Sequence, residues 1–182
     1  MISKNRMPTL SADRTFIRQH LNDENVKLID GRPPQQYTGE QPGRVFHTGK
    51  AHKHRGHIPG ATNVFWVDNF NPDGTFKSAR QLKALYAQRG IKPEKTAVAY
   101  CNEGLHAAPP WFVLSEILGF EDVRVYDDSM AEWGNSDDPT QLGPSPGKAL
   151  LPGSGNSPNK GSQPPGGSSP SENPSDENPP GR

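Results

Sequence analysis

Cys101 is the residue with the clearest capacity for covalent chemistry, and it is the single cysteine among 182 residues. It follows residues 96–100, an uncharged run of small and β-branched residues that predicts a buried strand. A short loop containing Gly104 comes next, followed by a helical pattern of apolar residues. Loop N–H groups and a helix N-terminus both stabilise negative charge, so a thiol at this junction can ionise more easily than usual. We therefore expect a lowered pKa for Cys101 and a nucleophilic thiolate.

The position of Cys101 also leaves a structural alternative open. A lone cysteine is often a small buried hydrophobe without reactivity. Its place at the carboxyl end of a strand favours the reactive alternative, because ligands of open α/β sheets bind at that edge. One cysteine excludes an internal disulfide and any metal site built from several cysteines.

Basic and histidine side chains are concentrated in the segment 41–67, which contains no Asp or Glu. Such a segment attracts anions toward a neighbouring site. Three of its histidines are spaced closely enough to suggest a metal cluster, but no cysteine accompanies them, so we favour a solvated basic loop and expect no metal. The cationic residues and histidines of the segment are Arg44, His47, Lys50, His52, Lys53, His54, Arg55 and His57.

Strand and helix signals alternate along the chain, which predicts a parallel sheet with right-handed crossovers. The predicted strands are 26–29, a short run after Gly60, 96–100 and 123–126. The predicted helices are about 12–21 after an N-cap at Ser11, a segment from Ser78 to Gly90, and a segment that begins at 106–108 and ends at Gly119.

Composition divides the chain into two parts. Positive and negative side chains balance at 20 each, which argues against a general nucleic-acid or membrane-surface binder. Mean hydropathy is −0.86, and thirty of the last forty residues are Gly, Pro, Ser or Asn, which bury too little apolar surface to fold. We therefore predict a flexible N-terminus at 1–9, one domain at 10–139 and a disordered tail at 140–182. The sequence shows no signal segment or membrane span, so we expect a cytoplasmic protein, or a periplasmic one if the N-terminus is truncated.

Three motifs, in their order and spacing, resemble those of the rhodanese family over about residues 10–138. They are Gly56-His57-Ile58-Pro59-Gly60-Ala61, Tyr100-Cys101-Asn102-Glu103-Gly104-Leu105-His106-Ala107 and Val125-Tyr126-Asp127-Asp128-Ser129-Met130-Ala131-Glu132-Trp133. The run Tyr37-Thr38-Gly39-Glu40 before the basic loop is most similar to the catalytic, C-terminal domain of tandem thiosulfate sulfurtransferases. The resemblance implies a rhodanese-like α/β fold of three layers, with a central, mainly parallel sheet flanked by helices.

The resemblance also implies transfer of a sulfane sulfur through Cys101. The donor would be thiosulfate or 3-mercaptopyruvate, the intermediate a Cys101 persulfide and the acceptor a thiol or cyanide, with no cofactor. The implied substrate-binding residues are Asn102, Glu103, Gly104, Leu105, His106, Ala107, Arg44 and Arg32. Asp30 and His57 are implied as structural residues near the site, and Asp30 could equally form an internal pair with Arg32 that braces the loop.

Several residues depart from the family's pattern. Gln36 stands where members often carry a second arginine, and Asn102 and Glu103 stand where many carry basic residues. A carboxylate at Glu103 opposes thiolate formation if it faces the sulfur. His106 could act as a nearby cation or simply face water, and both alternatives stay open.

Three functions remain open on this evidence. The first is a catalytic thiosulfate sulfurtransferase, the second a persulfide carrier that works with a sulfur-relay protein partner, and the third a non-catalytic rhodanese-like binding module. A phosphatase of the same fold is rejected, because Ala107 stands where a phosphate-clamping arginine is needed. We expect no nucleic-acid or membrane partner.

Overall fold

The computed structural model describes residues 10–149, so the predicted flexible N-terminus and most of the predicted tail lie outside the described residues. Four strands form one sheet in the order β2-β1-β3-β4, and each neighbouring pair is parallel. This confirms the parallel sheet predicted from the sequence. The strands are β1 (Val26–Asp30), β2 (Thr62–Asn63), β3 (Thr96–Tyr100) and β4 (Val123–Val125).

The central strand β3 is buried on both faces, as its apolar sequence predicts. Val98 and Tyr100 belong to one apolar cluster, Ala97 to a second and Ala99 to a third that includes Cys101. Successive side chains of a strand point to opposite faces of its sheet. The alternation therefore separates the core into two layers, one on each face.

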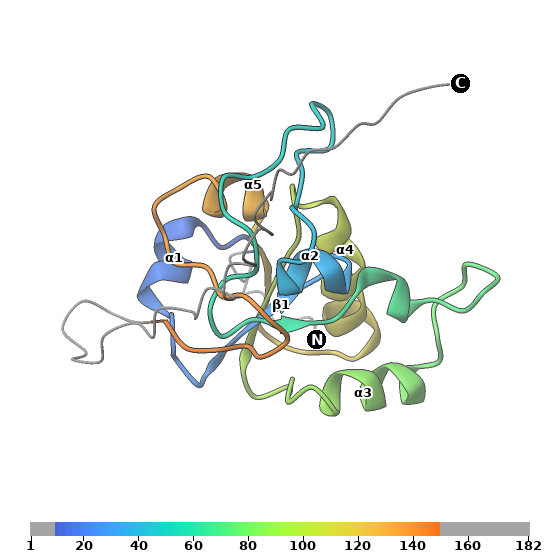
Figure 1. Ribbon diagram of the computed structural model, residues 1–182. Helices are drawn as coiled ribbons and strands as arrows, with labels where there is room; N and C mark the ends of the chain where they lie inside the picture. The colour runs from blue at the N-terminus through green and yellow to red at the C-terminus, as the bar shows by residue number, and fades with distance from the viewer. Residues whose placement is uncertain (1–9, 150–182) are drawn as a thin grey trace, which may run out of the picture. The chain divides into compact units, whose positions relative to one another are not determined.

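Helices cover both faces of the sheet, which confirms the predicted three-layer fold. One layer contains α1 (Arg14–Gln19) and α5 (Ser129–Trp133), and the other contains α3 (Ala79–Ala87) and α4 (Ala108–Phe112). Figure 1 shows α1 and α5 on one side of β1, with α3 and α4 on the other. Ile17 and Trp133 are fully buried in the first layer, and Leu82 is fully buried in the second.

The first helix begins later than its sequence predicts. Ser11 is the predicted N-cap, but the Asp13 carboxylate caps α1 by accepting a hydrogen bond from the Phe16 amide at 2.7 Å. Ser11 instead forms a parallel bridge with Val125, and the amide of Ala12 donates to the Val125 carbonyl at 2.9 Å. Pairing with β4 holds this backbone in the sheet, so the helix starts only beyond it.

The third helix begins at its predicted cap. The Ser78 hydroxyl accepts from the Gln81 amide, and the Gln81 side chain accepts from the Ser78 amide, which forms a capping box. Gly90 follows the helix with φ of 71°, as expected for a left-handed terminator.

Three kinds of helical turn succeed one another after the Cys101 loop. They are the 3-10 turn η2 (Leu105–Ala107), the α-helix α4 and the π-helical turn η3 (Val113–Ile117). Pro109 and Pro110 lie in the first turn of α4, where their missing N–H groups break no helical hydrogen bond, as the sequence predicts. Within residues 10–149, none of the helices has the length and apolar character that crossing a membrane requires.

Residues 140–149 pack on the domain, so the folded part extends beyond the predicted boundary at 139. Ala149 is 6 % exposed and belongs to the apolar cluster that contains Trp133. Its amide donates to the Asn22 side chain, which donates back to the Ala149 carbonyl, both at 2.8 Å. Gln141 exchanges two backbone hydrogen bonds with His57. A segment rich in Gly and Pro is held here by backbone hydrogen bonds, which composition does not reveal.

Candidate active site

The carboxyl ends of β1 and β3 lie side by side and place two loops at one edge of the sheet. Asp30 pairs with Tyr100 in the strand register, and the Gly31 amide donates to the Tyr100 carbonyl at 2.9 Å. A Cβ atom at Gly31 would lie 2.6 Å from the carbonyl oxygen of His106, so glycine allows the Cys101 loop to cross this strand end closely. Cys101 thus stands at the sheet edge where the sequence predicts a ligand site.

Cys101 lines a cavity of about 300 Å³, although only 1 % of the residue is exposed. Three segments build the cavity: the loop after β3, the helix α2 (Pro34–Thr38) and the hairpin 44–51, which an antiparallel bridge closes at its base. The predicted site residues that line it are Cys101, Asn102, Glu103, Leu105, His106 and Arg44. The lining residues that the sequence prediction did not include are Gln36, Val45, Phe46 and Gly49.

The hydroxyl of Ser129 holds the loop that begins at Cys101. Its Oγ accepts hydrogen bonds from the amides of Cys101 at 3.0 Å and Gly104 at 3.2 Å, and donates to the Tyr126 carbonyl at 2.7 Å. Ser129 is fully buried, and its φ of 49° lies in the left-handed region. The sequence prediction missed this residue. The sequence does carry a signal for such a role, since Ser129 directly follows two aspartates at the start of a helix. Serine hydroxyls at such positions often form hydrogen bonds with nearby backbone groups.

Burial raises the pKa of the Cys101 thiol above its ordinary value. Three loop amides, those of Glu103, His106 and Ala107, donate toward the sulfur and lower the pKa by less, and the Asp30 charge adds a small rise. The lowered pKa predicted from the sequence is therefore wrong for the free protein. The predicted amides are present, but a thiolate removed from water loses more solvation than they return.

Two other loop amides are used inside the protein. The Gly104 amide donates to Ser129, and the Leu105 amide donates to the Glu103 carbonyl at 3.0 Å. Gly104 has φ of 79°, and the Asp127 carboxylate occupies the place that a Cβ atom would take. Of the predicted loop donors, the amides of Glu103, His106 and Ala107 are the ones that lower the pKa of the thiol, and the Ala107 amide also donates to the Gly104 carbonyl at 2.9 Å.

Glu103 ties the Cys101 loop to the hairpin 44–51. Its carboxylate accepts a hydrogen bond from the Phe46 amide and pairs with Nδ1 of His47 at 3.1 Å. Arg44 lines the cavity, and its guanidinium donates to the Gly49 carbonyl at 2.9 Å within the hairpin. The Glu103 carboxylate is thus directed to donors of the hairpin, which hold one wall of the cavity in place.

Arg32 forms the internal pair with Asp30. Its Nη2 lies 2.6 Å from Oδ2 of Asp30 and donates to the Gly56 carbonyl at 2.8 Å. Both side chains are at most 1 % exposed, and Arg32 does not line the Cys101 cavity. Of the two roles that the sequence left open for Arg32, the geometry shows the brace between the first strand and the Gly56 turn.

His57 is a buried structural residue. Its Nδ1 lies 2.8 Å from the Tyr37 carbonyl oxygen, and its ring stacks on Tyr37 with centroids 3.7 Å apart. Its Nε2 lies 3.1 Å from the Ser145 carbonyl oxygen, so His57 connects α2 to the C-terminal segment. No group of three or more His, Cys, Asp or Glu side chains in residues 10–149 is arranged to hold a metal ion.

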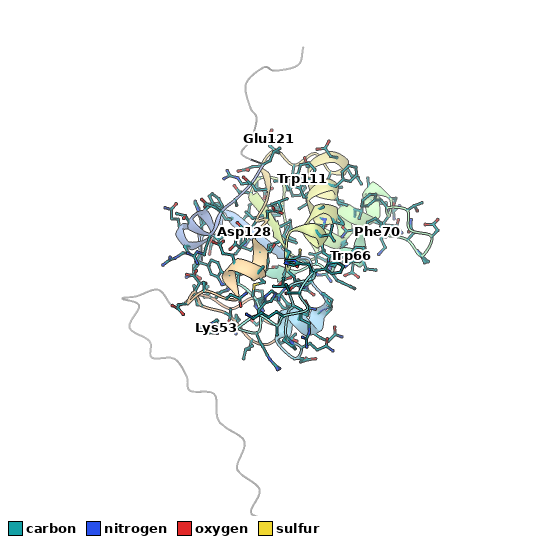
Figure 2. The ribbon with its side chains drawn as sticks, turned by 90° about the horizontal axis from the view of Figure 1, so that it is seen from above. Lys53, Trp66, Phe70, Trp111, Glu121 and Asp128 are labelled. Atoms are coloured by element: carbon teal, nitrogen blue, oxygen red, sulfur yellow. The ribbon has the colours of Figure 1, made fainter. Side chains whose placement is uncertain are left out.

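His106 packs against Trp66 beside the Cys101 loop. The ring centroids are 4.9 Å apart and the planes lie within 7° of parallel. Trp66 in turn contacts Phe70 edge-on at 5.9 Å, and the two lie together in Figure 2. Burial lowers the pKa of His106, which favours a neutral ring at neutral pH. His106 therefore supplies an aromatic surface rather than a fixed positive charge.

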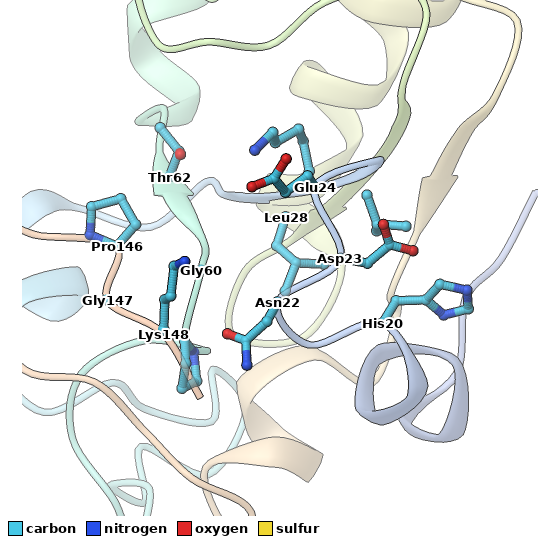
Figure 3. Close-up of a pocket in the computed structure, with 13 residues that line it drawn as sticks. His20, Asn22, Asp23, Glu24, Leu28, Gly60, Thr62, Pro146, Gly147 and Lys148 are labelled. Atoms are coloured by element: carbon cyan, nitrogen blue, oxygen red, sulfur yellow. The ribbon is translucent and has the colours of Figure 1, made fainter. Parts of the chain in front are cut away.

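A second cavity of about 220 Å³ lies near the amino end of β1, away from Cys101. Figure 3 shows Gly147 and Lys148 on one side of it and Asn22 and Asp23 on the other. The cavity contains no cysteine and joins the C-terminal segment to the turn before β1. We therefore place the candidate active site at Cys101.

Comparison with known proteins agrees with this geometry. The family described as "Rhodanese-like domain" matches residues 14–136. The "Sulfur carrier protein TtuD" of Thermus thermophilus is 45 % identical over 133 residues, which cover 71 % of this chain and 47 % of that protein. A "Thiosulfate sulfurtransferase" of Corynebacterium glutamicum is 44 % identical over 112 residues, which cover 60 % of this chain and 36 % of that protein. The chain spans less than half the length of these curated relatives.

Solved structures show the same fold. Wild-type EanB matches with a TM-score of 0.66 and 27 % identity, over 74 % of this chain and 32 % of EanB. The anaerobic ergothioneine biosynthesis enzyme of Chlorobium limicola, in complex with trimethyl histidine, matches with a TM-score of 0.65 and 25 % identity, over 74 % of this chain and 32 % of that enzyme.

Proposed function

The chain belongs to the rhodanese-like domain family, and on that premise we propose that it moves a sulfane sulfur from thiosulfate to a thiol or cyanide through a persulfide on Cys101. The match over residues 14–136 and the relatives named as a thiosulfate sulfurtransferase and a sulfur carrier support sulfur transfer as the class of reaction. Thiosulfate as donor and the identity of the acceptor are our proposal.

The proposed reaction consists of two displacements at sulfur. In the first, the Cys101 thiolate attacks the outer sulfur of thiosulfate, a new S–S bond forms, and sulfite leaves with the electron pair of the broken S–S bond. In the second, cyanide or a thiolate attacks the outer sulfur of the persulfide, and the Cys101 thiolate leaves. The products are thiocyanate or a persulfide of the acceptor, and no external oxidant or reductant takes part.

The observation that carries the proposal is the convergence of three backbone N–H groups on a single thiol beside a cavity. The amides of Glu103, His106 and Ala107 donate toward the Cys101 sulfur. Donors fixed by the fold in a site with little water stabilise developing negative charge without reorganising. They are positioned to stabilise the thiolate that attacks and the charged persulfide that results.

Intact-protein mass spectrometry tests the proposal directly. Incubation with thiosulfate is expected to add one sulfur atom to the wild-type protein, to release one sulfite per protein, and to leave Cys101→Ser unmodified. Subsequent addition of cyanide is expected to restore the original mass and yield thiocyanate. A wild-type mass unchanged by thiosulfate over a range of pH would contradict the proposed donor.

Exposed apolar side chains at the cavity favour a second candidate, a persulfide carrier that exchanges sulfur with a protein partner. Phe46 is 83 % exposed and Leu105 is 67 % exposed, and both line the Cys101 cavity. Large exposed apolar side chains beside a functional site are typical of partner contacts. The relative from Thermus thermophilus is named a sulfur carrier protein.

The two candidates differ in what delivers sulfur to Cys101. For a carrier, a cysteine desulfurase with free cysteine is expected to load Cys101 much faster than thiosulfate does. The double variant Phe46→Ser with Leu105→Ser is then expected to slow loading from the desulfurase and to leave loading from thiosulfate unchanged. If the double variant slows loading from thiosulfate and from the desulfurase equally, the apolar residues do not mark a partner site.

A further inference from the structure

We propose that His52, acting through Asn102, orients the side-chain amide of Gln36 so that its N–H donors face the Cys101 cavity and bind the oxygen atoms of an anionic sulfur donor. The proposal rests on the proposed function and deepens it. It names Gln36 as a residue that selects the donor and His52 as its positioning residue.

Three side chains from distant parts of the chain form one hydrogen-bonded row. Nε2 of His52 lies 3.1 Å from Oδ1 of Asn102, and Nδ2 of Asn102 donates to Oε1 of Gln36 at 2.9 Å. Asn102 and Gln36 line the same cavity as Cys101. With its oxygen engaged by Asn102, Gln36 has both N–H groups of its amide available to a ligand, since within residues 10–149 no acceptor bonds them.

The buried end of the row determines its direction. His52 is 6 % exposed, and its Nδ1 is the single buried side-chain polar atom in residues 10–149 without a hydrogen-bond partner. With the proton on Nε2, His52 donates to Asn102 and leaves a bare lone pair at Nδ1. In the reverse direction, Nε2 of His52 would accept a hydrogen bond from Asn102. The ring proton would then be on Nδ1, where a buried N–H would have no acceptor. Orphaned buried N–H groups are the rarer defect in proteins, so the first direction is favoured.

Electrostatics favours the neutral form of His52. Burial lowers the pKa of His52; the hydrogen bond with Asn102 opposes this shift, the positive charge of Arg32 adds to it by less, and the Glu103 charge opposes it by less still. A neutral His52 donates through one nitrogen only, and the row gives that proton to Asn102. If His52 does take a second proton, Nε2 still donates, so the Gln36 oxygen still faces Asn102.

The fold leaves space for this row and for little else. A Cβ atom at Gly43 would lie 2.5 Å from Cδ2 of His52 and 2.8 Å from Oδ1 of Asn102. On the other side, a Cβ atom at Gly134 would lie 3.2 Å from Cβ of His52. The His52 side chain is therefore enclosed between Gly43, just before the hairpin, and Gly134, just after α5, so packing restricts its orientation.

The expected consequence is a neutral, directional contact with the donor. Two N–H groups of one amide can hold the oxygen atoms of a sulfonate or carboxylate group, while the reacting sulfur lies toward Cys101. Hydrogen bonds to charged groups are stronger than neutral ones, so losing this contact is expected to weaken donor binding by about 10- to 100-fold.

The experiment measures thiosulfate binding and thiosulfate-dependent loading of Cys101 in the full chain. Affinity is measured by calorimetry on a Cys101→Ser background, which separates binding from sulfur transfer, and loading is measured by intact mass. The variants are Gln36→Leu, His52→Phe and the double variant. His52→Gln offers an amide donor to Asn102 as a conservative rescue, and His20→Phe at the distant second cavity is the matched control.

We expect Gln36→Leu and His52→Phe each to weaken thiosulfate affinity, and the double variant to be no weaker than Gln36→Leu alone, because both act through one contact. The rate at saturating thiosulfate should change less than the KM, and His52→Gln should recover part of the affinity. Nitrogen-15 spectra of the imidazole should show His52 protonated at Nε2.

Several outcomes would overturn the inference. They are an unchanged affinity in Gln36→Leu, additive losses in the double variant, or a His52 ring protonated at Nδ1 alone. Failure of the proposed function has a different signature, in which the wild-type protein gains no sulfur from thiosulfate. In that case, affinity on the Cys101→Ser background and the His52 spectrum still decide whether the row binds the anion.

Discussion

The Ser129 hydroxyl accepts a hydrogen bond from the Cys101 amide at 3.0 Å, across 28 positions of the chain. Because the same oxygen accepts from the Gly104 amide, one side chain fixes the first turn of the loop that carries the thiol. Its own proton goes to the Tyr126 carbonyl, so the hydroxyl is fully engaged. The start of α5 thereby determines the shape of the loop after β3.

Replacing Ser129 by Ala is expected to destabilise the protein and to slow sulfur loading. The change leaves the buried Cys101 and Gly104 amides without an acceptor, which costs about 1–3 kcal/mol per group in free energy of unfolding. Urea unfolding measures the stability, and intact mass after brief exposure to thiosulfate measures the loading. Ser115→Ala is the matched control, because within residues 10–149 that hydroxyl donates its hydrogen bond to the exposed Glu116 side chain. Equal stability of the two variants would contradict the anchoring role.

The rate of Cys101 loading should increase with pH and have a midpoint above the ordinary thiol pKa of about 8.5. Burial raises the thiol pKa, so the protonated form persists to higher pH, and only the thiolate attacks. The same shift makes the thiol's contribution to stability complete below the ordinary pKa and lost as pH rises through the raised one. Initial rates with thiosulfate at a series of pH values measure the midpoint, and a value below the ordinary pKa would contradict the upward shift.

Removing one partner of the buried Arg32 and Asp30 pair should cost about 3–5 kcal/mol in free energy of unfolding, because the remaining charge stays buried without a counterion. Arg32→Met tests this by urea unfolding. Arg32→Met with Asp30→Leu is expected to be more stable than the single variant, since it removes both charges. Arg55→Met is the control, because its side chain is exposed. A stable Arg32→Met that only loses thiosulfate affinity would assign Arg32 to the substrate instead.

Truncation should locate the end of the folded domain. A chain ending at Leu151 is expected to melt at the same temperature as the full chain, whereas a chain ending at Pro139 should melt several degrees lower. The shorter chain loses the Ala149 contact with the apolar core and the hydrogen bonds of Gln141 with His57. Calorimetric melting of the three chains measures this. Equal melting temperatures would show that residues 140–149 add no stability and would support a domain boundary at 139.

Sequence reasoning predicted the sheet and the position of Cys101 because the signals there are local. The run in β3 alternates between two apolar faces, and the Ser78 cap lies three residues from its partner Gln81. The Ser11 cap failed for the opposite reason, since its backbone pairs with Val125 from the far end of the domain.

The sequence alone determined that one thiol follows a buried strand and precedes a tight, glycine-containing loop. Tertiary structure alone decided what surrounds that thiol: Ser129 beneath the loop, and Gln36 and His52 joined to Asn102 across 66 and 50 positions. It also decided the direction of the Cys101 pKa, because residue type and spacing report which donors are near, whereas the loss of water depends on how the whole chain packs.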